Sequence, residues 1–344
     1  MKICFETVTR QAKFLDPTRG FEPRTVSTEI RRDPLTGEGG RILAFPSRPT
    51  PRPDLDALVK LSREIGCPFC PDVIDKVTPI FDPDLIPEGR LHVGEATVLP
   101  NLGPYDTYSG LTIITREHFV PMSGFSQAQL VDAFVAGQTY LQRVREKDPT
   151  AAYCSINWNY MPPAGSTMVH PHMQPFAGSG QSNRERLLLD SSARYLVENK
   201  SVFWLDLVEE EQRQGARFIA QEGSIAWLAS FAPRSPKDVM AVFLDRSNLL
   251  DITGGEFQTF VDGLRRTMRY FDKLNLYSMN LTLFSAPADA EGFRVHARIV
   301  SRAPISPVMT SDRNYFPVLH GESLSTGRPE ETAAGLRESW SCGA

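Results

Sequence analysis

Two histidines and a glutamine occupy alternate positions in one short segment, and this spacing restricts the backbone there. The segment reads Val169-His170-Pro171-His172-Met173-Gln174-Pro175-Phe176. Proline disfavours helical dihedrals in the residue before it, so we expect a strand, with His170, His172 and Gln174 on one face. Two neutral imidazoles beside a carboxamide can supply a metal ligand, a nucleophile and a hydrogen-bonding group. Taken alone, the segment could also be a loop with two surface histidines.

A second motif, Cys67-Pro68-Phe69-Cys70-Pro71, has two cysteines spaced as half of a tetrahedral zinc site. A redox pair of the thioredoxin type would follow a strand and open a helix, whereas the polar residues 72–76 indicate a loop between elements. The other two ligands must come from six histidines. His118 ends an apolar run at 111–115, and His170 begins the first motif. We therefore expect zinc at Cys67, Cys70, His118 and His170, with a reduced, metal-free thiol pair as the alternative.

Composition fits a soluble cytoplasmic protein. A chain of 344 residues that is 41% hydrophobic can form two domains or one large duplicated domain. The net charge of −4 and the pI near 5.9 give no basic surface for nucleic acid or an anionic membrane. Five cysteines, an odd number, argue against a disulfide framework. No apolar run has the length of a signal peptide or of a membrane span.

Several segments have the spacing of regular elements. We expect helices at 54–65 and 126–145, the second opened by Ser126 as its N-cap. Short strands are expected at 41–45, 96–99 and 152–159. Residues 1–55 otherwise hold no strand candidate and are expected to form an arm, and residues 325–344 a surface helix or a loose tail.

The second half of the chain repeats the order of the first. Residues 242–254 and a helix at 255–273 line up with 112–124 and its following helix, and 293–299 lines up with the strand of the first motif. This alignment places Asn248 opposite His118, His296 opposite His170, and Arg298 opposite His172. A duplicated α+β unit in which the first copy alone keeps both imidazoles would have one reactive centre.

Five motifs in chain order resemble those of the galactose-1-phosphate uridylyltransferase family, the transferase branch of the histidine-triad superfamily. They are residues 31–38, the arginines Arg48 and Arg52, Cys67–Pro71 with Thr78-Pro79, Leu99-Pro100-Asn101, and residues 164–174. The resemblance implies an α+β fold of duplicated histidine-triad-like units, each an antiparallel sheet with helices packed on it, assembled as a homodimer. It divides the chain into an amino-terminal arm (1–55), a first half with both motifs (56–190), a second half (191–325) and a carboxy-terminal tail (326–344).

The resemblance also implies the site and its chemistry. It assigns zinc to the four residues above and makes His172 the nucleophile that attacks the α-phosphorus of a nucleoside diphosphate hexose, with Gln174 holding phosphate oxygens. The implied substrate contacts are Arg48, Arg52, Asn101, Asn159, Ser166 and Thr167. The implied activity is a ping-pong transfer of UMP between a nucleotide sugar such as UDP-glucose and a hexose 1-phosphate, as in galactose metabolism.

Departures from the family pattern keep other functions open. Met173 replaces a smaller residue, and we expect it to narrow the floor beneath the phosphate. Arg298 stands where many family members have a histidine, so we expect no second metal site. Carboxy-terminal candidates for sugar contacts are Tyr315, His320 and Glu322. One alternative function is a phosphorylase or hydrolase of nucleotide sugars or dinucleoside polyphosphates. The other is a non-catalytic, zinc-containing nucleotide-binding protein.

Overall fold

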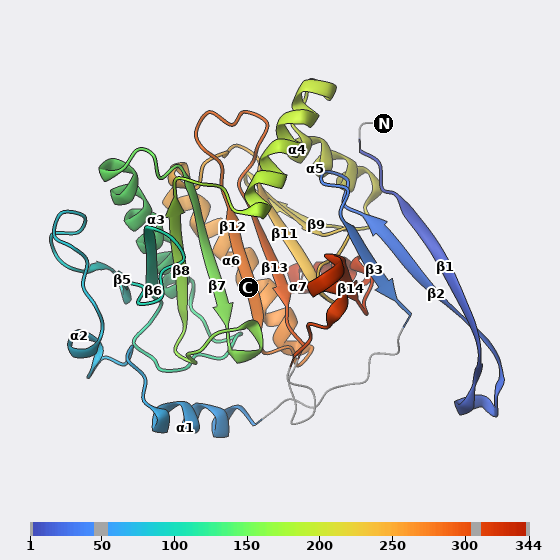
Figure 1. The fold of residues 1–344 in the computed structure, drawn as a ribbon, viewed down its shortest axis with the longest axis horizontal. Helices are drawn as coiled ribbons and strands as arrows, with labels where there is room; N and C mark the ends of the chain where they lie inside the picture. Colours follow the sequence, from blue (N-terminus) through green and yellow to red (C-terminus); the bar gives the residue numbers. More distant parts are fainter. Residues whose placement is uncertain (1–2, 45–53, 304–310, 342–344) are drawn as a thin grey trace.

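The computed structural model describes residues 3–44, 54–303 and 311–341, and its centre is one large antiparallel sheet (Figure 1). Every pairing between neighbouring strands in this sheet is antiparallel. Its ten strands lie in the order β4 (Leu91–Val93), β5 (Ala96–Pro100), β6 (Tyr108–Ile113), β8 (His172–Gly178), β7 (Tyr153–Tyr160), β12 (Met279–Phe284), β13 (His296–Ser301), β11 (Asp238–Phe243), β10 (Ile225–Ala229) and β9 (Phe218–Glu222).

The strand order is symmetric about the centre of the sheet. From one edge it runs β4-β5-β6-β8-β7, and from the other β9-β10-β11-β13-β12. The two sets meet where β7 pairs with β12, from Tyr160 opposite Met279 to Ser155 opposite Phe284. The predicted α+β class with antiparallel strands is confirmed, and the sheets of the two predicted units are joined edge to edge. The residue boundaries of the two halves stay a prediction.

Two long helices pack on one face of this sheet, one from each set of strands. They are α3 (Gln127–Lys147) and α6 (Gly254–Lys273). Each opens with a capping box, Ser126 with Gln129 and Thr253 with Glu256, which satisfies backbone N–H groups that a helix start leaves free. Between them lies an aromatic core in which the Phe134 ring stacks on Phe257 at 5.7 Å. Burial of such rings is a main source of stability here.

The opposite face is covered unevenly. Helices α4 (Asn183–Asn199) and α5 (Phe203–Gln214) close over β10 and β11 with a second apolar cluster, which includes Trp204, Leu228 and Met240. Over β8 and β7 the same face borders a cavity instead. The uneven cover leaves one half of this face accessible at the first motif.

The amino-terminal segment contains more structure than the sequence predicts. Strands β1 (Thr7–Asp16) and β2 (Glu22–Arg32) form a long hairpin that projects from the body, and β3 (Gly39–Leu43) pairs antiparallel with β2 and parallel with β14 (Ser323–Ser325) (Figure 1). The expectation of a single strand in this region was wrong. Most of β1 is exposed, so its sequence lacks the alternation that burial of one face imposes.

The remaining helices are short or terminal. They are α1 (Leu55–Ile65), α2 (Ile74–Val77), α7 (Pro329–Ser341) and the single turns η1 (Pro17–Arg19), η2 (Pro162–Ala164), η3 (Leu249–Asp251) and η4 (Phe316–His320). The helices predicted at 54–65, 126–145 and 255–273 match α1, α3 and α6. Helix α7 is not a loose tail, because Ala333 and Leu336 are buried in the main core. Within the described ranges, no helix combines the length and apolarity needed to cross a membrane.

Candidate functional site

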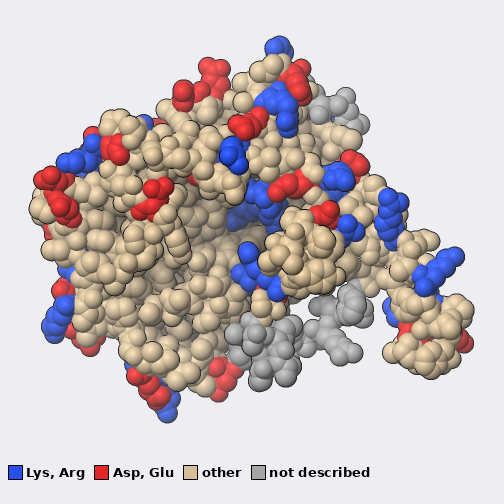
Figure 2. Space-filling view, viewed as in Figure 1, with Lys and Arg blue, Asp and Glu red and all other residues tan. Residues whose placement is uncertain are grey.

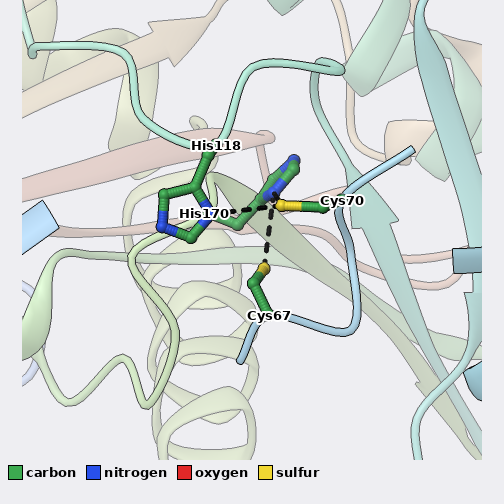
Figure 3. A group of neighbouring side chains, drawn as sticks. All are labelled: Cys67, Cys70, His118 and His170. Atoms are coloured by element: carbon green, nitrogen blue, oxygen red, sulfur yellow. Dashed lines mark hydrogen bonds between the residues drawn. The ribbon is translucent and has the colours of Figure 1, made fainter. Parts of the chain in front are cut away.

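Four side chains that are distant in sequence converge in the first half (Figure 3). Cys67 and Cys70 come from the loop between α1 and α2, His118 from the loop after β6, and His170 from the residues just before β8. The four ligand atoms lie within 4.8 Å of one another. Nδ1 of His118 is 3.3 Å from Sγ of Cys70, and Nδ1 of His170 is 3.6 Å from Sγ of Cys67. This group, predicted from sequence, could hold a metal ion.

Hydrogen bonds on the far side of each ring favour the tautomer that a metal requires. The hydroxyl of Ser62 donates to the carbonyl of Val59, so its oxygen can accept from Nε2–H of His118, 2.7 Å away. Nε2 of His170 lies 2.8 Å from the carbonyl of Thr115, to which it can only donate. In both rings Nδ1 then carries the lone pair and points toward the cysteines.

The pKa values of this group favour uncharged side chains unless a cation is bound. Burial lowers the pKa of His170 to about 4 and also lowers that of His118, which keeps both rings neutral. Burial raises the pKa of Cys67 to about 11, and the neighbouring thiol of Cys70 adds to this. Thiolates at this position therefore need a positive charge, which a bound metal ion would supply.

His172 begins β8 and is held by the residue that contributes to the metal group. Its Nδ1 lies 2.9 Å from the carbonyl oxygen of His170, to which the ring N–H can donate, leaving the lone pair on Nε2. The ring of Phe69, inside the C-x-x-C motif, lies 5.3 Å from the His172 ring between centroids. Burial lowers the pKa of His172, so the imidazole is neutral and nucleophilic.

A cavity of about 260 Å³ lies beside His172. Its wall includes Gln174 from β8, Pro68 and Phe69 from the cysteine loop, and the turn that follows β5. Among the residues that the structure describes, those lining this cavity include no Lys, Arg, Asp or Glu. The volume is close to the lower end of the range for small-molecule sites, as suits a group of nucleoside size. The described wall offers hydrogen bonds and aromatic contact instead of charge.

Four of the predicted substrate contacts line this cavity with His172 and Gln174. They are Asn101, Asn159, Ser166 and Thr167. Asn101 is held by its Nδ2 donating to Ser109 Oγ and its Oδ1 accepting from the backbone of Gly103. The Ser166 hydroxyl donates to the carbonyl of Met168 at 2.6 Å. The other two predicted contacts, Arg48 and Arg52, lie outside the described residues.

The sequence missed a hydrogen-bonded support behind the cavity. Nδ2 of Asn280, in β12, donates to Oδ1 of Asn159 at 2.7 Å, and Arg302 donates to Oδ1 of Asn280 at 2.9 Å. Asn280 lies directly opposite Asn159 in the pairing of β12 with β7. No motif signals this contact, because it depends on how the two halves of the sheet join.

Met173 does not line the cavity at His172, where we expected it to narrow the floor of the site. It is fully buried in the main core on the other face of the sheet, opposite Thr112 and Trp158 in neighbouring strands. Alternation along a strand places it away from both His172 and Gln174. A larger residue at this position therefore fills the core beneath the long helices and leaves the cavity unchanged.

Strand positions also correct the alignment of the two halves. His172 begins β8 and His296 begins β13, and Nδ1 of each ring lies near the carbonyl oxygen of the residue two positions earlier. These shared features match His296 with His172, and Arg298 with Gln174. Gln174 and Arg298 also lie in one row of directly opposite residues, with Asn157 and Thr282 between them. The sequence alignment, which matched His296 with His170, is shifted by two residues. Such a shift keeps every side chain on its face, so the sequence pattern cannot detect it.

Comparisons with known proteins agree with this architecture. No protein-family model matches the chain. An uncharacterized protein of Archaeoglobus fulgidus is 34% identical over 315 residues, which cover 91% of this chain and 92% of that protein.

Several solved structures have a similar fold at low sequence identity. An ADP-glucose phosphorylase from Arabidopsis thaliana with bound ADP-glucose has a TM-score of 0.70 at 17% identity, covering 90% of this chain and 99% of that one. A GalT-like protein from the same plant has a TM-score of 0.69 at 17% identity, with 90% and 98% covered. A uridylyltransferase structure has a TM-score of 0.65 at 22% identity, with 91% and 99% covered. The chain therefore has the fold of the galactose-1-phosphate uridylyltransferase-like proteins, and it belongs to one family with the Archaeoglobus fulgidus protein.

Proposed function

We propose that the protein is a nucleotidyltransferase that works through a covalent nucleotidyl intermediate on His172. The observation that carries the proposal is the state of this side chain. Its ring is neutral, its Nδ1 is engaged by the carbonyl of His170, and it borders a nucleoside-sized cavity that Gln174 also lines. A buried imidazole with one fixed nitrogen and a substrate cavity beside it is suited to nucleophilic catalysis.

The reaction would proceed in two displacements. Nε2 of His172 attacks the α-phosphorus of a nucleoside diphosphate sugar, and the bond to the bridging oxygen breaks, so that sugar 1-phosphate leaves. A phosphate oxygen of the acceptor then attacks the same phosphorus, and the P–N bond to His172 breaks. The side-chain amide of Gln174 would donate to nonbridging oxygens, where charge builds up in both transition states.

The four-residue metal group fits zinc. Tetrahedral zinc with Zn–S near 2.3 Å and Zn–N near 2.0 Å separates sulfur from nitrogen by about 3.5 Å, and the two short S–N distances here are 3.3 and 3.6 Å. Bound zinc would act as a cross-link between the cysteine loop and β8. The ring of His170 would bind the metal, and the carbonyl oxygen of His170 accepts a hydrogen bond from the ring of His172. Metal binding and the position of the nucleophile are therefore linked.

The donor of first choice is a UDP-hexose such as UDP-glucose, with a hexose 1-phosphate as the acceptor. The candidate sugar contacts Tyr315, His320 and Glu322 do not line the cavity at His172, and Glu322 instead pairs with Arg41 of β3. We propose that a second subunit of a homodimer completes the sugar site. Arg48 and Arg52 would offset the phosphate charge that the described wall leaves uncompensated.

A second candidate is phosphorolysis of a nucleotide sugar, with inorganic phosphate as the acceptor. Two observations favour it. Within the described part of the chain, the cavity wall has no charged group to orient a sugar phosphate, and the similar Arabidopsis structure is that of an ADP-glucose phosphorylase. Inorganic phosphate needs fewer contacts than a sugar phosphate, so it is the simpler acceptor for such a wall.

Acceptor dependence tests these candidates. Purified protein is incubated with UDP-glucose or ADP-glucose and with galactose 1-phosphate, inorganic phosphate or no acceptor, and products are separated by chromatography. A transferase turns over with the sugar phosphate, and a phosphorylase with inorganic phosphate. Turnover with neither, together with saturable nucleotide binding and no covalent intermediate, would support a non-catalytic binding protein instead.

A further inference from the structure

A second cavity, of about 100 Å³, lies in the other half of the sheet at the place that corresponds to the site of His172. His296 and Arg298 of β13 line it, and their positions in β13 are those of His172 and Gln174 in β8. Gln174 and Arg298 also lie in one row of directly opposite residues. Directly opposite residues share a sheet face, so both cavities lie on the same face. Helices α4 and α5 cover the second cavity.

The second cavity is unsuited to covalent catalysis. The ring of Trp204 stacks on His296 at 3.9 Å between centroids, and Phe284 stacks on it at 5.2 Å. Burial lowers the pKa of His296 to about 3, which keeps it neutral, and two aromatic side chains contact its ring. A volume of about 100 Å³ leaves no room beside this ring for a nucleoside phosphate, so this cavity is suited to binding without reaction.

The wall of the second cavity is mainly apolar. Its apolar side chains come from both helices and from the sheet, and they include Leu188, Phe203, Leu207, Leu228, Phe231 and Met240. Apolar cavities of about 150 Å³ in other proteins hold one benzene-sized ring. The cavity here is smaller, so its size sets one ring as the upper limit, and its apolar lining suits such a ring.

One polar atom in this wall lacks a partner. Glu211 of α5 is 1% exposed, and its Oε1 accepts from Nε of Arg217 at 2.9 Å. Its Oε2 is buried and has no hydrogen-bond partner. Burial raises the pKa of Glu211 to about 7 even though Arg217 lies beside it. A buried carboxylate oxygen without a donor is costly, and a ligand with an N–H or O–H group would supply one.

The arginines of the wall are already paired with carboxylates and leave no unbalanced positive charge to bind an anion. Arg298 donates to Asp238 through two nitrogens, and Arg184 and Arg234 both donate to Glu38. Figure 2 shows Lys and Arg side chains within a hollow below the region of α4, with acidic side chains close by. Because these guanidinium groups already have carboxylate partners, an uncharged ligand is the better match.

We propose that this cavity binds a small, uncharged, single-ring molecule that donates a hydrogen bond to Oε2 of Glu211. The site is separate from the cavity at His172 and does not depend on the proposed transfer reaction. In this protein one half of the duplicated sheet would then carry the reaction, and the other half a ligand site at the corresponding position.

The experiment compares phenol with toluene, two rings of similar size of which only phenol has a donor. Binding to the full chain is followed by ligand-observed NMR and calorimetry. Phenol is expected to bind at least tenfold more tightly than toluene, which is about 1.4 kcal/mol. Glu211→Gln keeps the shape and the acceptor for Arg217 but replaces Oε2 by a donor. In this variant the amide can donate to the phenol oxygen, but that bond lacks the charge of the carboxylate and is weaker. The preference for phenol is therefore expected to decrease while toluene binding persists.

Leu228→Phe provides a second variant that fills the cavity and leaves Glu211 in place. It is expected to abolish binding of both probes, with nucleotide transfer at His172 unchanged. The proposal is overturned if neither probe binds the wild type, if the preference for phenol is undiminished in Glu211→Gln, or if phenol binds the filled variant as tightly as before. Leu228→Phe decides the matter even where Glu211→Gln does not fold.

Discussion

His172 and His296 make the same backbone hydrogen bond in the two halves of one sheet. Each ring places Nδ1 near the carbonyl oxygen of the residue two positions earlier, at 2.9 Å in His172 and 3.0 Å in His296. Their surroundings differ, because His172 borders a cavity of about 260 Å³, whereas the cavity at His296 is about 100 Å³ and lies under helices α4 and α5. The strand geometry alone therefore does not define a reactive centre. The helices that pack on this face of the sheet determine beside which of the two histidines a substrate phosphate could bind.

Replacement of His172 by alanine should abolish the covalent step. Without the imidazole no P–N bond can form, and we expect turnover to fall by at least about 10³-fold, measured by steady-state assay with the active donor. His92→Ala is the matched control, since His92 is exposed on β4 and its ring contacts Thr97. If His172→Ala turns over at the wild-type rate, another residue is the nucleophile.

Replacement of Gln174 by alanine should slow the reaction more than it weakens binding. The amide is proposed to donate to phosphate oxygens whose charge grows in the transition state, so its loss should lower kcat by about 10² to 10³-fold, with the nucleotide Kd within about threefold. Single-turnover kinetics and calorimetry separate these two quantities. A change confined to Kd would assign Gln174 to ground-state binding.

Replacement of Ser62 by alanine should weaken the metal site without removing a ligand. The Ser62 hydroxyl lies 2.7 Å from Nε2 of His118 and favours its tautomer, so its loss should reduce zinc affinity by about 10- to 100-fold. Competition with a chromophoric chelator measures this affinity. Lys60→Ala, on the exposed face of the same helix, is the control. Equal affinities in the two variants would show that Ser62 does not support the ligand.

Glu38→Gln should destabilise the fold in a pH-dependent way. Burial opposes ionisation of Glu38, but hydrogen bonds and charges from Arg184 and Arg234 outweigh it and lower its pKa from 4.5 to about 2. The stabilisation is therefore complete above pH 4.5 and is lost as the pH falls through about 2.

We expect Glu38→Gln to lose about 1–3 kcal/mol near pH 7 and progressively less below pH 4.5, measured by urea unfolding across this range. Glu64→Gln, at an exposed position on α1, is the control and should change little at any pH. A loss at pH 3 as large as that at pH 7 would assign the effect to packing.

The sequence predicted those features that depend on a few rare residues or on a local pattern. The cysteine spacing and the scarcity of histidines identified the group formed by Cys67, Cys70, His118 and His170, which the structure brings together. The capped, periodic helix at 126–145 was found for similar reasons, since Ser126 and the apolar spacing are local signals.

Features that depend on pairing between strands far apart in the chain could not be predicted from the sequence. The contact of Asn280 with Asn159 exists because β12 and β7 are neighbours at the centre of the sheet. The correspondence of His296 with His172 was offset by two residues, a shift that leaves the alternating pattern intact. Strand β1 was missed because most of its residues are exposed and carry no one-sided pattern.

The most direct test of the proposed mechanism is the mass of the intact protein after brief incubation with UDP-, ADP- or GDP-glucose, in wild type and in His172→Ala. We predict a gain of one mononucleotide in wild type with one of the donors, and no gain in the variant. The donor that produces it also identifies the base. No gain in folded, zinc-loaded wild type with any donor, or the same gain in His172→Ala, would contradict covalent transfer through His172.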